Sequence, residues 1–125
     1  MPNRTEIDPF ELRAHLPYLG LLDVLCHGTD FRYRLLGTAI TDRFARNSTG
    51  CTVTEVYGGG DPLLFQWMLA IYQNAVTARL PVLGCGTLRA VGKDYLRFEV
   101  LNLPFAGADG EVGVIMSRAR FLDPV

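Results

Sequence analysis

Residues 31–38 change from strand-like to helix-like patterning within one short stretch. Phe31 and Tyr33 alternate with arginines, which is the pattern of a strand with one buried face. Gly37 removes the side chain at the bend, and Thr38 stands where the cap of a following helix is expected. This stretch therefore predicts a strand-to-helix corner.

The chain before this corner predicts a short helix and a second strand. Asp8 and Pro9 occupy the N-cap and first positions of a helix over residues 8–16. A mostly apolar run over 18–26 predicts a strand, and the polar residues 27–30 predict the turn that leads into the corner. We expect the two strands to pair as a hairpin.

Between the corner and residue 80 the pattern predicts helices. A short helix is expected over 39–45, a polar loop over 47–50 and an irregular stretch over 51–60. The longest helix is expected over 61–79, because an Asp-Pro pair starts it and a Leu-Pro pair ends it. Its apolar residues cover one wide face; they are Leu64, Phe65, Trp67, Met68, Leu69, Ile71, Tyr72, Ala75, Val76 and Ala78.

The last part of the chain predicts strands in meander spacing. They are expected over 82–90, 95–104 and 111–121, with turns at 91–94 and 106–110. Strands that bracket helices in this order indicate an antiparallel sheet with the helices on one face. That is an α+β fold rather than an alternating βαβ fold.

Alternation along the strand over 95–104, which we expect to be the central one, assigns its buried side. The side chains that share this side are Leu96, Phe98, Val100 and Asn102. Asn102 is the polar member, and an unsatisfied buried polar group costs about 1 to 3 kcal/mol. Two interpretations stay open, a ligand contact or a hydrogen bond to backbone near the strand end. On the last strand, the side with Arg118 and Arg120 is expected to face outward.

Three local motifs carry a family resemblance. They are IDPFELRAHLP from Ile7, FRYRLLGT from Phe31, and the Thr-Gly pair that ends the polar loop at Gly50. Together they resemble a bacterial group of PAS domains over nearly the whole chain. The resemblance implies a five-stranded antiparallel sheet that encloses a small cavity with its helices. Residues 1–17 are then expected to be an N-terminal extension that contains the capping helix, followed by a PAS-like domain at 18–125, in a single domain overall.

Composition narrows the function classes. A net charge of −1 gives no electrostatic footprint for nucleic acid, and 49% hydrophobic residues are typical of a globular domain. The three cysteines are odd in number and lack CxxC spacing, which indicates reduced thiols in a cytoplasmic protein. Neither a secretion signal nor a membrane-spanning run is present in the sequence. We expect no nucleic-acid partner and no membrane partner.

The sequence does not identify a cofactor or a catalytic group. His15 and His27 stand near no serine or cysteine with a helper carboxylate, so neither catalysis nor metal binding is predicted. The helix over 61–79 has no histidine, the usual haem ligand of PAS domains. The stretch after the corner also lacks the reactive-cysteine motif of flavin-binding light sensors.

We therefore expect a non-enzymatic sensory module that binds a small molecule, a signalling protein partner, or both. Apolar walls with few polar anchors are the usual make-up of a ligand site. The candidate ligand contacts are Tyr33, Arg43, Trp67, Tyr72, Phe98 and Asn102. Arg43, with Arg46 three residues later, is expected to attract an anionic group.

The chain is also expected to form a homodimer. A two-turn helix is marginal alone, so the helix over 8–16 should pack against other parts of the dimer. We expect Phe10, Leu12 and Leu16 to contact either the outer face of the sheet or the same helix in the other subunit. An adaptor that binds a protein by its sheet and holds no ligand is one alternative. The other is a small α+β enzyme of cone-shaped fold that acts on an apolar substrate, with Asp23 or Glu99 as base.

Overall fold

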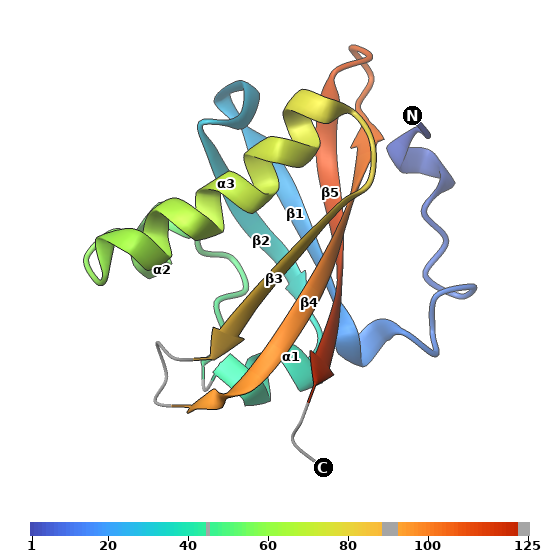
Figure 1. Ribbon diagram of the computed structural model, residues 1–125. Helices are drawn as coiled ribbons and strands as arrows, with labels where there is room; N and C mark the ends of the chain where they lie inside the picture. Colours follow the sequence, from blue (N-terminus) through green and yellow to red (C-terminus); the bar gives the residue numbers. More distant parts are fainter. Residues whose placement is uncertain (45, 89–92, 123–125) are drawn as a thin grey trace.

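The computed structural model describes residues 1–44, 46–88 and 93–122, and of residues 87–88 and 93–96 the backbone only. A single antiparallel sheet has five strands in the order β2-β1-β5-β4-β3 (Figure 1). The strands are β1 (Leu19–Leu25), β2 (Asp30–Leu36), β3 (Val82–Leu88), β4 (Lys93–Ala106) and β5 (Val112–Leu122). The expected α+β fold with an antiparallel sheet is confirmed. The strand end expected at 90 and part of the turn over 91–94 lie outside the described residues.

The centre of the sheet is β5, so the expectation that residues 95–104 form the central strand was wrong. β5 pairs with β1 on one side and with β4 on the other. Val114, Ile115 and Met116 follow one another on β5 and are all buried. Consecutive buried apolar residues are typical of a strand that is covered on both faces. Here the helices cover one face and the N-terminal residues cover the other.

Three helices lie on one face of the sheet (Figure 1). They are α1 (Thr38–Phe44), α2 (Val53–Tyr57) and α3 (Pro62–Ala78). α3 starts as expected, because the Asp61 side chain accepts a hydrogen bond from the Leu63 N–H. α2 falls inside the stretch that was expected to be irregular. Thr52 and Glu55 form a capping box at its start.

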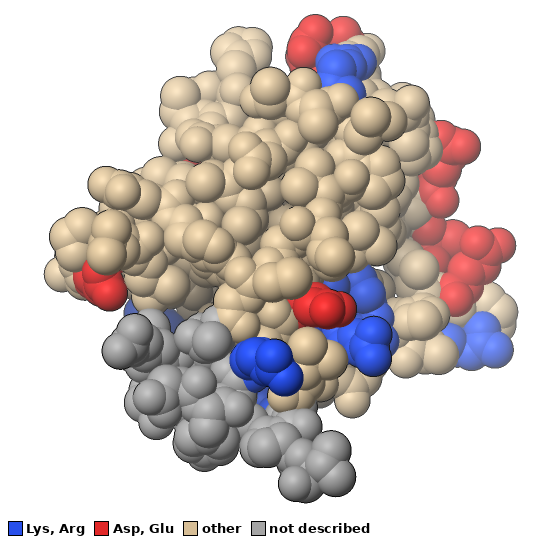
Figure 2. Space-filling view, viewed as in Figure 1, with Lys and Arg blue, Asp and Glu red and all other residues tan. Residues whose placement is uncertain are grey.

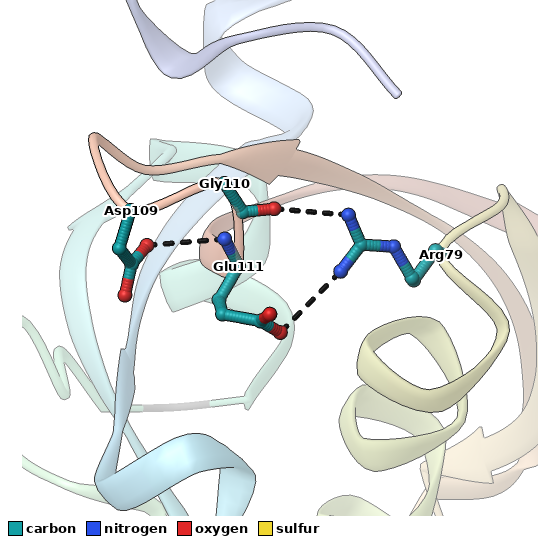
Figure 3. A network of polar contacts seen from close by, with 4 residues as sticks. All are labelled: Arg79, Asp109, Gly110 and Glu111. Atoms are coloured by element: carbon teal, nitrogen blue, oxygen red, sulfur yellow. Dashed lines mark hydrogen bonds and ion pairs between the residues drawn. The ribbon is translucent and has the colours of Figure 1, made fainter.

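α3 is also fixed at its other end (Figure 3). Arg79 takes a left-handed backbone conformation there, with φ of 55°. Its guanidinium donates to the Gly110 carbonyl oxygen at 2.9 Å and lies 3.4 Å from the Glu111 carboxylate. Asp109 accepts from the Glu111 N–H at 3.1 Å. These contacts join the end of α3 to the turn between β4 and β5.

The N-terminal residues are not the expected α-helix. Residues 9–15 form successive turns between two short 3-10 helices, η1 (Arg4–Glu6) and η2 (Leu16–Tyr18). Leu12 donates to the Asp8 carbonyl in the α-helical pattern, but His15 donates to the Leu12 carbonyl, which is the tighter pattern. A lone two-turn helix is unstable, so contacts with the sheet decide the course of this segment.

These contacts lie on the outer face of the sheet, opposite α3. Leu12 and Leu16 pack with Leu19 and Met116 in one apolar cluster, as expected for two of the three named residues. Phe10 does not join them, because its side chain is 70% exposed. The predicted helix boundary was wrong, whereas the predicted face was right for the two leucines.

The expected inner and outer sides of the strands are confirmed where side chains are described. Phe98 and Val100 are buried against the helices, and Arg97 is exposed. The side chain of Leu96 lies outside the described part. On β5, Ser117 is buried on the inner face and Arg120 is exposed. Strand parity therefore gave the core side of both strands.

A close contact explains the glycine at the strand-to-helix corner. A Cβ added at Gly37 would lie 2.2 Å from the carbonyl oxygen of Leu16 and 2.3 Å from that of Pro17. The Gly37 N–H donates to the Leu19 carbonyl at 2.8 Å. The start of α1 therefore rests directly on the backbone of the N-terminal segment.

The surface over α3 is nearly free of charge. The helix contains no lysine, arginine, aspartate or glutamate. In Figure 2 this face is almost uniformly uncharged, with charged side chains gathered toward its lower part and its edges. The charged groups of the domain thus lie mainly away from α3.

Candidate functional site

A cavity lies between the inner face of the sheet and the helices. Its volume is about 50 Å³. A water molecule needs roughly 10 to 15 Å³ measured in this way, so the cavity has room for about three to five water-sized atoms. The lining residues come from β1, β2, β4, β5, all three helices and the loop after α1. Most of them are apolar. The polar side chains that line it are Tyr33, Arg46, Ser48, Tyr57, Tyr72 and Ser117.

Three tyrosine hydroxyls form the main polar group of the cavity. The Tyr33 and Tyr72 hydroxyl oxygens are 3.3 Å apart. Tyr57 also lines the cavity and contributes to the raised pKa of Tyr33. Burial raises the pKa of Tyr33 well above its usual range, with smaller contributions from Tyr72 and Tyr57. Burial also raises the pKa of Tyr72 and of Tyr57. All three hydroxyls are therefore protonated at neutral pH.

Tyr33 is held by the loop that covers the free edge of β2. Its N–H donates to the Cys51 carbonyl at 2.9 Å, and its carbonyl accepts from the Gly50 N–H at 2.6 Å. Gly50 has φ of 88°, a conformation that favours glycine. The Thr-Gly pair of the sequence motif thus serves to pair this loop with the strand that carries Tyr33.

Tyr72 is placed by the close packing of α3 on the sheet. Its ring contacts the ring of Phe31 with centroids 5.4 Å apart. The neighbouring strand β3 carries glycines where α3 approaches, and a Cβ at Gly86 would lie 3.1 Å from both Trp67 and Phe98. The close approach of α3 therefore explains the glycine at this position.

Arg46 and Ser48 lie in the loop after α1. Arg46 is exposed yet lines the cavity, so it stands where the cavity meets solvent. Its charge acts to lower the pKa of Tyr57, although burial outweighs this effect. Among the described residues that line the cavity, Arg46 alone carries a charge.

A family model described as the PAS domain matches residues 1–117. The chain belongs to the PAS domain family. Members of this family are typically sensory or signalling modules. No curated protein matches the sequence.

Two solved structures share the fold. The PAS domain from Bordetella pertussis BvgS is 21% identical, with a TM-score of 0.63, over 95% of this chain and 88% of that chain. A sensory box sensor histidine kinase from Vibrio cholerae is 11% identical, with a TM-score of 0.61, over 93% of this chain and 90% of that chain. At these identities the likeness shows the PAS fold alone.

Three of the six expected ligand contacts of this PAS domain line the cavity. Tyr33, Tyr72 and Phe98 do so, and the structure brings them together from β2, α3 and β4. Trp67 does not line it; its ring packs edge-on against the Phe98 ring, with centroids 5.7 Å apart. The Arg43 guanidinium lies 4.9 Å from the centre of the Phe121 ring, also away from the cavity lining.

Asn102 is fully buried but does not line the cavity. Its amide nitrogen donates to the Ile71 carbonyl on α3 at 3.3 Å. Its oxygen accepts from the Ser117 hydroxyl of the neighbouring strand β5. Of the two interpretations left open, the hydrogen bond to backbone is therefore the one observed. The backbone group belongs to α3, however, and not to the end of the strand that carries Asn102.

The cavity also contains residues that the sequence did not indicate, namely Tyr57 and Ser48. Tyr57 ends α2, a helix of five residues, which is too short to produce a periodic apolar pattern. The pair Thr52 and Glu55 has capping-box spacing and is the signal that could have located α2. Ser48 had no comparable signal.

The described residues also bear on whether the chain has a metal site or a membrane-spanning helix. No three His, Cys, Asp or Glu residues of the described chain are grouped so that they could hold a metal ion. Of the helices that the structure describes, none has both the length and the apolarity to span a bilayer.

Proposed function

We propose that this PAS domain is a non-enzymatic sensory module that holds a small molecule in its cavity and signals by association with a second copy or another protein. The observation that carries the proposal is the cluster of buried tyrosine hydroxyls that faces a cavity between the sheet and the helices. Such a mostly apolar space with a few convergent polar groups is the usual form of a ligand site. Two structures with this fold are described as a sensor histidine kinase and as the PAS domain of BvgS.

The positions of the carboxylates favour sensing over the alternative of a small enzyme. Asp23 is bonded to Arg34 on the outer side of the hairpin. Glu99 stands opposite Arg120, likewise on the outer side of the sheet. Neither lines the cavity, where a catalytic base would have to reach the substrate.

A cavity-filling variant tests whether the space takes a ligand. Ala119 lines the cavity, so Ala119→Leu should fill it, at a stability cost of about 1 to 3 kcal/mol. Ala70→Leu adds the same side chain at an exposed site on α3 and serves as the control. We expect a screen of small metabolites by thermal denaturation to find compounds that stabilise the native protein and Ala70→Leu but not Ala119→Leu. A screen in which no compound separates these variants would contradict ligand sensing.

The surface for association is the outer face with its N-terminal segment. Phe10 on this segment is 70% exposed, and Leu83 and Leu101, register partners on β3 and β4, are 59% and 36% exposed. An exposed apolar side of this kind favours a homodimer. We expect Phe10→Ser to shift the protein from dimer to monomer in light scattering. Leu63→Ser on α3 removes a side chain that is 75% exposed, and should leave the dimer unchanged.

A monomeric native protein, or equal behaviour of the two variants, would contradict this assignment. Deletion of residues 1–17 gives a second measurement, because it removes the segment altogether. A dimer that survives the deletion would also exclude the N-terminal segment as the interface.

A further inference from the structure

The three tyrosine hydroxyls of the cavity have more protons than the contacts among them use. Each hydroxyl can donate one proton. The contact of Tyr33 with Tyr72 uses one of the three protons. The separation of 3.3 Å between Tyr33 and Tyr72 is also long for two hydroxyls, which normally lie about 2.5 to 3.0 Å apart. The cluster therefore has donors available for a partner that accepts hydrogen bonds.

The charge of the cavity points to the same kind of partner. A guanidinium has donors only, and Arg46 is the one charged side chain among the described residues of the lining. No aspartate or glutamate of the described lining would repel an anion. Because burial raises the pKa of Tyr33 and of Tyr72, these hydroxyls stay protonated and meet an anion as donors. Hydrogen bonds to an ionised acceptor are the stronger kind.

The size and the remaining walls narrow the partner further. A volume of about 50 Å³ accommodates about three to five non-hydrogen atoms. Apart from Ser48 and Ser117, the rest of the lining is apolar and includes Leu22, Met68 and Ile71. A carboxylate with a hydrogen or a methyl group on its carbon has this combination of two acceptor oxygens, small size and a short apolar end.

We propose that the cavity binds a small monocarboxylate of the size of formate or acetate, with the tyrosine hydroxyls and Arg46 as donors to its oxygens. This inference rests on the proposed sensory function, since it names the ligand class of the same cavity. It assigns a role to Tyr57 and Arg46, which complete the set of donors around Tyr33 and Tyr72.

The test is a titration of the full chain, followed by NMR of the backbone amides. Sodium acetate is compared with acetamide, its neutral analogue of similar size, at an ionic strength held constant with sodium chloride. We expect acetate to shift the amide signals around Tyr33, Tyr57 and Tyr72 in a saturable way. Acetamide should bind at least about tenfold more weakly, because it lacks the charge-assisted bonds. Equal binding of the two, or no saturable shift by acetate, would overturn the proposal.

Two arginine variants separate a site from a general effect of charge. Arg46→Gln should weaken acetate binding at least about tenfold, and Arg43→Gln, which removes a charge away from the cavity lining, should change it less than about threefold. Equal effects of the two substitutions would overturn the role of Arg46. Tyr33→Phe retains the ring and removes the central hydroxyl, so it should also weaken acetate about tenfold if it folds. Tyr57→Phe gives the same measurement at a less buried position.

The result also distinguishes this inference from the proposed function. Acetate could fail to bind while another small molecule stabilises the native protein and not Ala119→Leu. That result would support the proposed sensory function and contradict a carboxylate as the ligand. If no small molecule separates those two proteins, both fall together.

Discussion

The two faces of the sheet are covered in different ways. The inner face lies under three helices, and its buried polar side chains, such as Asn102 and Ser117, bond to one another. The outer face lies under a segment of turns and carries exposed pairs, such as Asp23 with Arg34. The inner face therefore combines apolar packing with buried polar contacts, while the outer face has an apolar cluster under the N-terminal segment and leaves Leu83 and Leu101 partly exposed.

The largest expected effect tests the packing of the inner face. Phe98 is 4% exposed and its ring contacts those of Phe44, Trp67 and Phe121. Phe98→Ala should lower the free energy of unfolding by about 3 to 5 kcal/mol, because it leaves a cavity in the core. Arg97→Ala, the next residue on the opposite side of β4, should stay within about 0.5 kcal/mol. If urea unfolding gave the same loss of free energy for Phe98→Ala and Arg97→Ala, the assignment of the two faces of β4 would be wrong.

Alkaline pH should destabilise the inner face selectively. The ordinary pKa of tyrosine is 10.0, and burial raises the pKa of Tyr33 well above that value in the folded protein. Above pH 10 the unfolded chain loses this proton while the folded protein keeps it, so stability falls as pH rises. The full contribution is present below pH 10. While the folded protein keeps the proton that the unfolded chain has lost, the slope is about 1.4 kcal/mol per pH unit for each such tyrosine.

The measurement is urea unfolding at a series of pH values from 9 to 12, which spans about two units above the ordinary pKa. Tyr33→Phe should show a shallower decline than the native protein. If the free energy of unfolding of Tyr33→Phe fell with pH as steeply as that of the native protein, the Tyr33 hydroxyl would not contribute to the pH dependence of stability.

A smaller effect is expected at Asn102. Asn102→Leu would leave the Ile71 carbonyl and the Ser117 hydroxyl without their partner, at a cost of about 1 to 3 kcal/mol. Ser117→Ala removes only one of the two bonds and should cost less. Since Asn102 does not line the cavity, acetate binding should change little in folded Asn102→Leu. If Asn102→Leu lowered the free energy of acetate binding by more than the free energy of unfolding, the amide would be a ligand contact after all.

The smallest effect is expected on the outer face. The Arg34 side chain is 51% exposed in its ion pair with Asp23. Arg34→Ala should therefore cost about 0 to 1 kcal/mol, and less at high salt. Thermal denaturation at low and at high salt measures this. A cost above about 2 kcal/mol would show that this pair is as important as an inner contact.

The sequence predicted the two faces better than it predicted what joins them. Alternation reports burial directly, so Phe98, Asn102 and Arg97 were placed on the correct sides. Pairing of β5 with β1 joins residues far apart in the chain and leaves no local period, so the strand order was missed. The same holds for Asn102, whose partner Ile71 is 31 residues away.

Local signals also have limits at the ends of short elements. Asp8 does accept a hydrogen bond from the Phe10 N–H, as an N-cap should, yet no α-helix follows it. The cap describes only the first turn, while the sheet contacts of Leu12 decide the rest. For the cavity, aromatic residues on long elements were found and those on the five-residue α2 were not.

The contact at Gly37 gives the domain a mechanical property. α1 supplies Ile40 and Phe44 to the cavity wall, and its first turn rests on the backbone of Leu16 and Pro17. No side chain cushions that junction, so a shift of either part is transmitted to the other as a displacement of backbone rather than absorbed by a rotamer change. A displacement of α1 at the cavity wall would therefore also displace the backbone of the N-terminal segment, and the reverse.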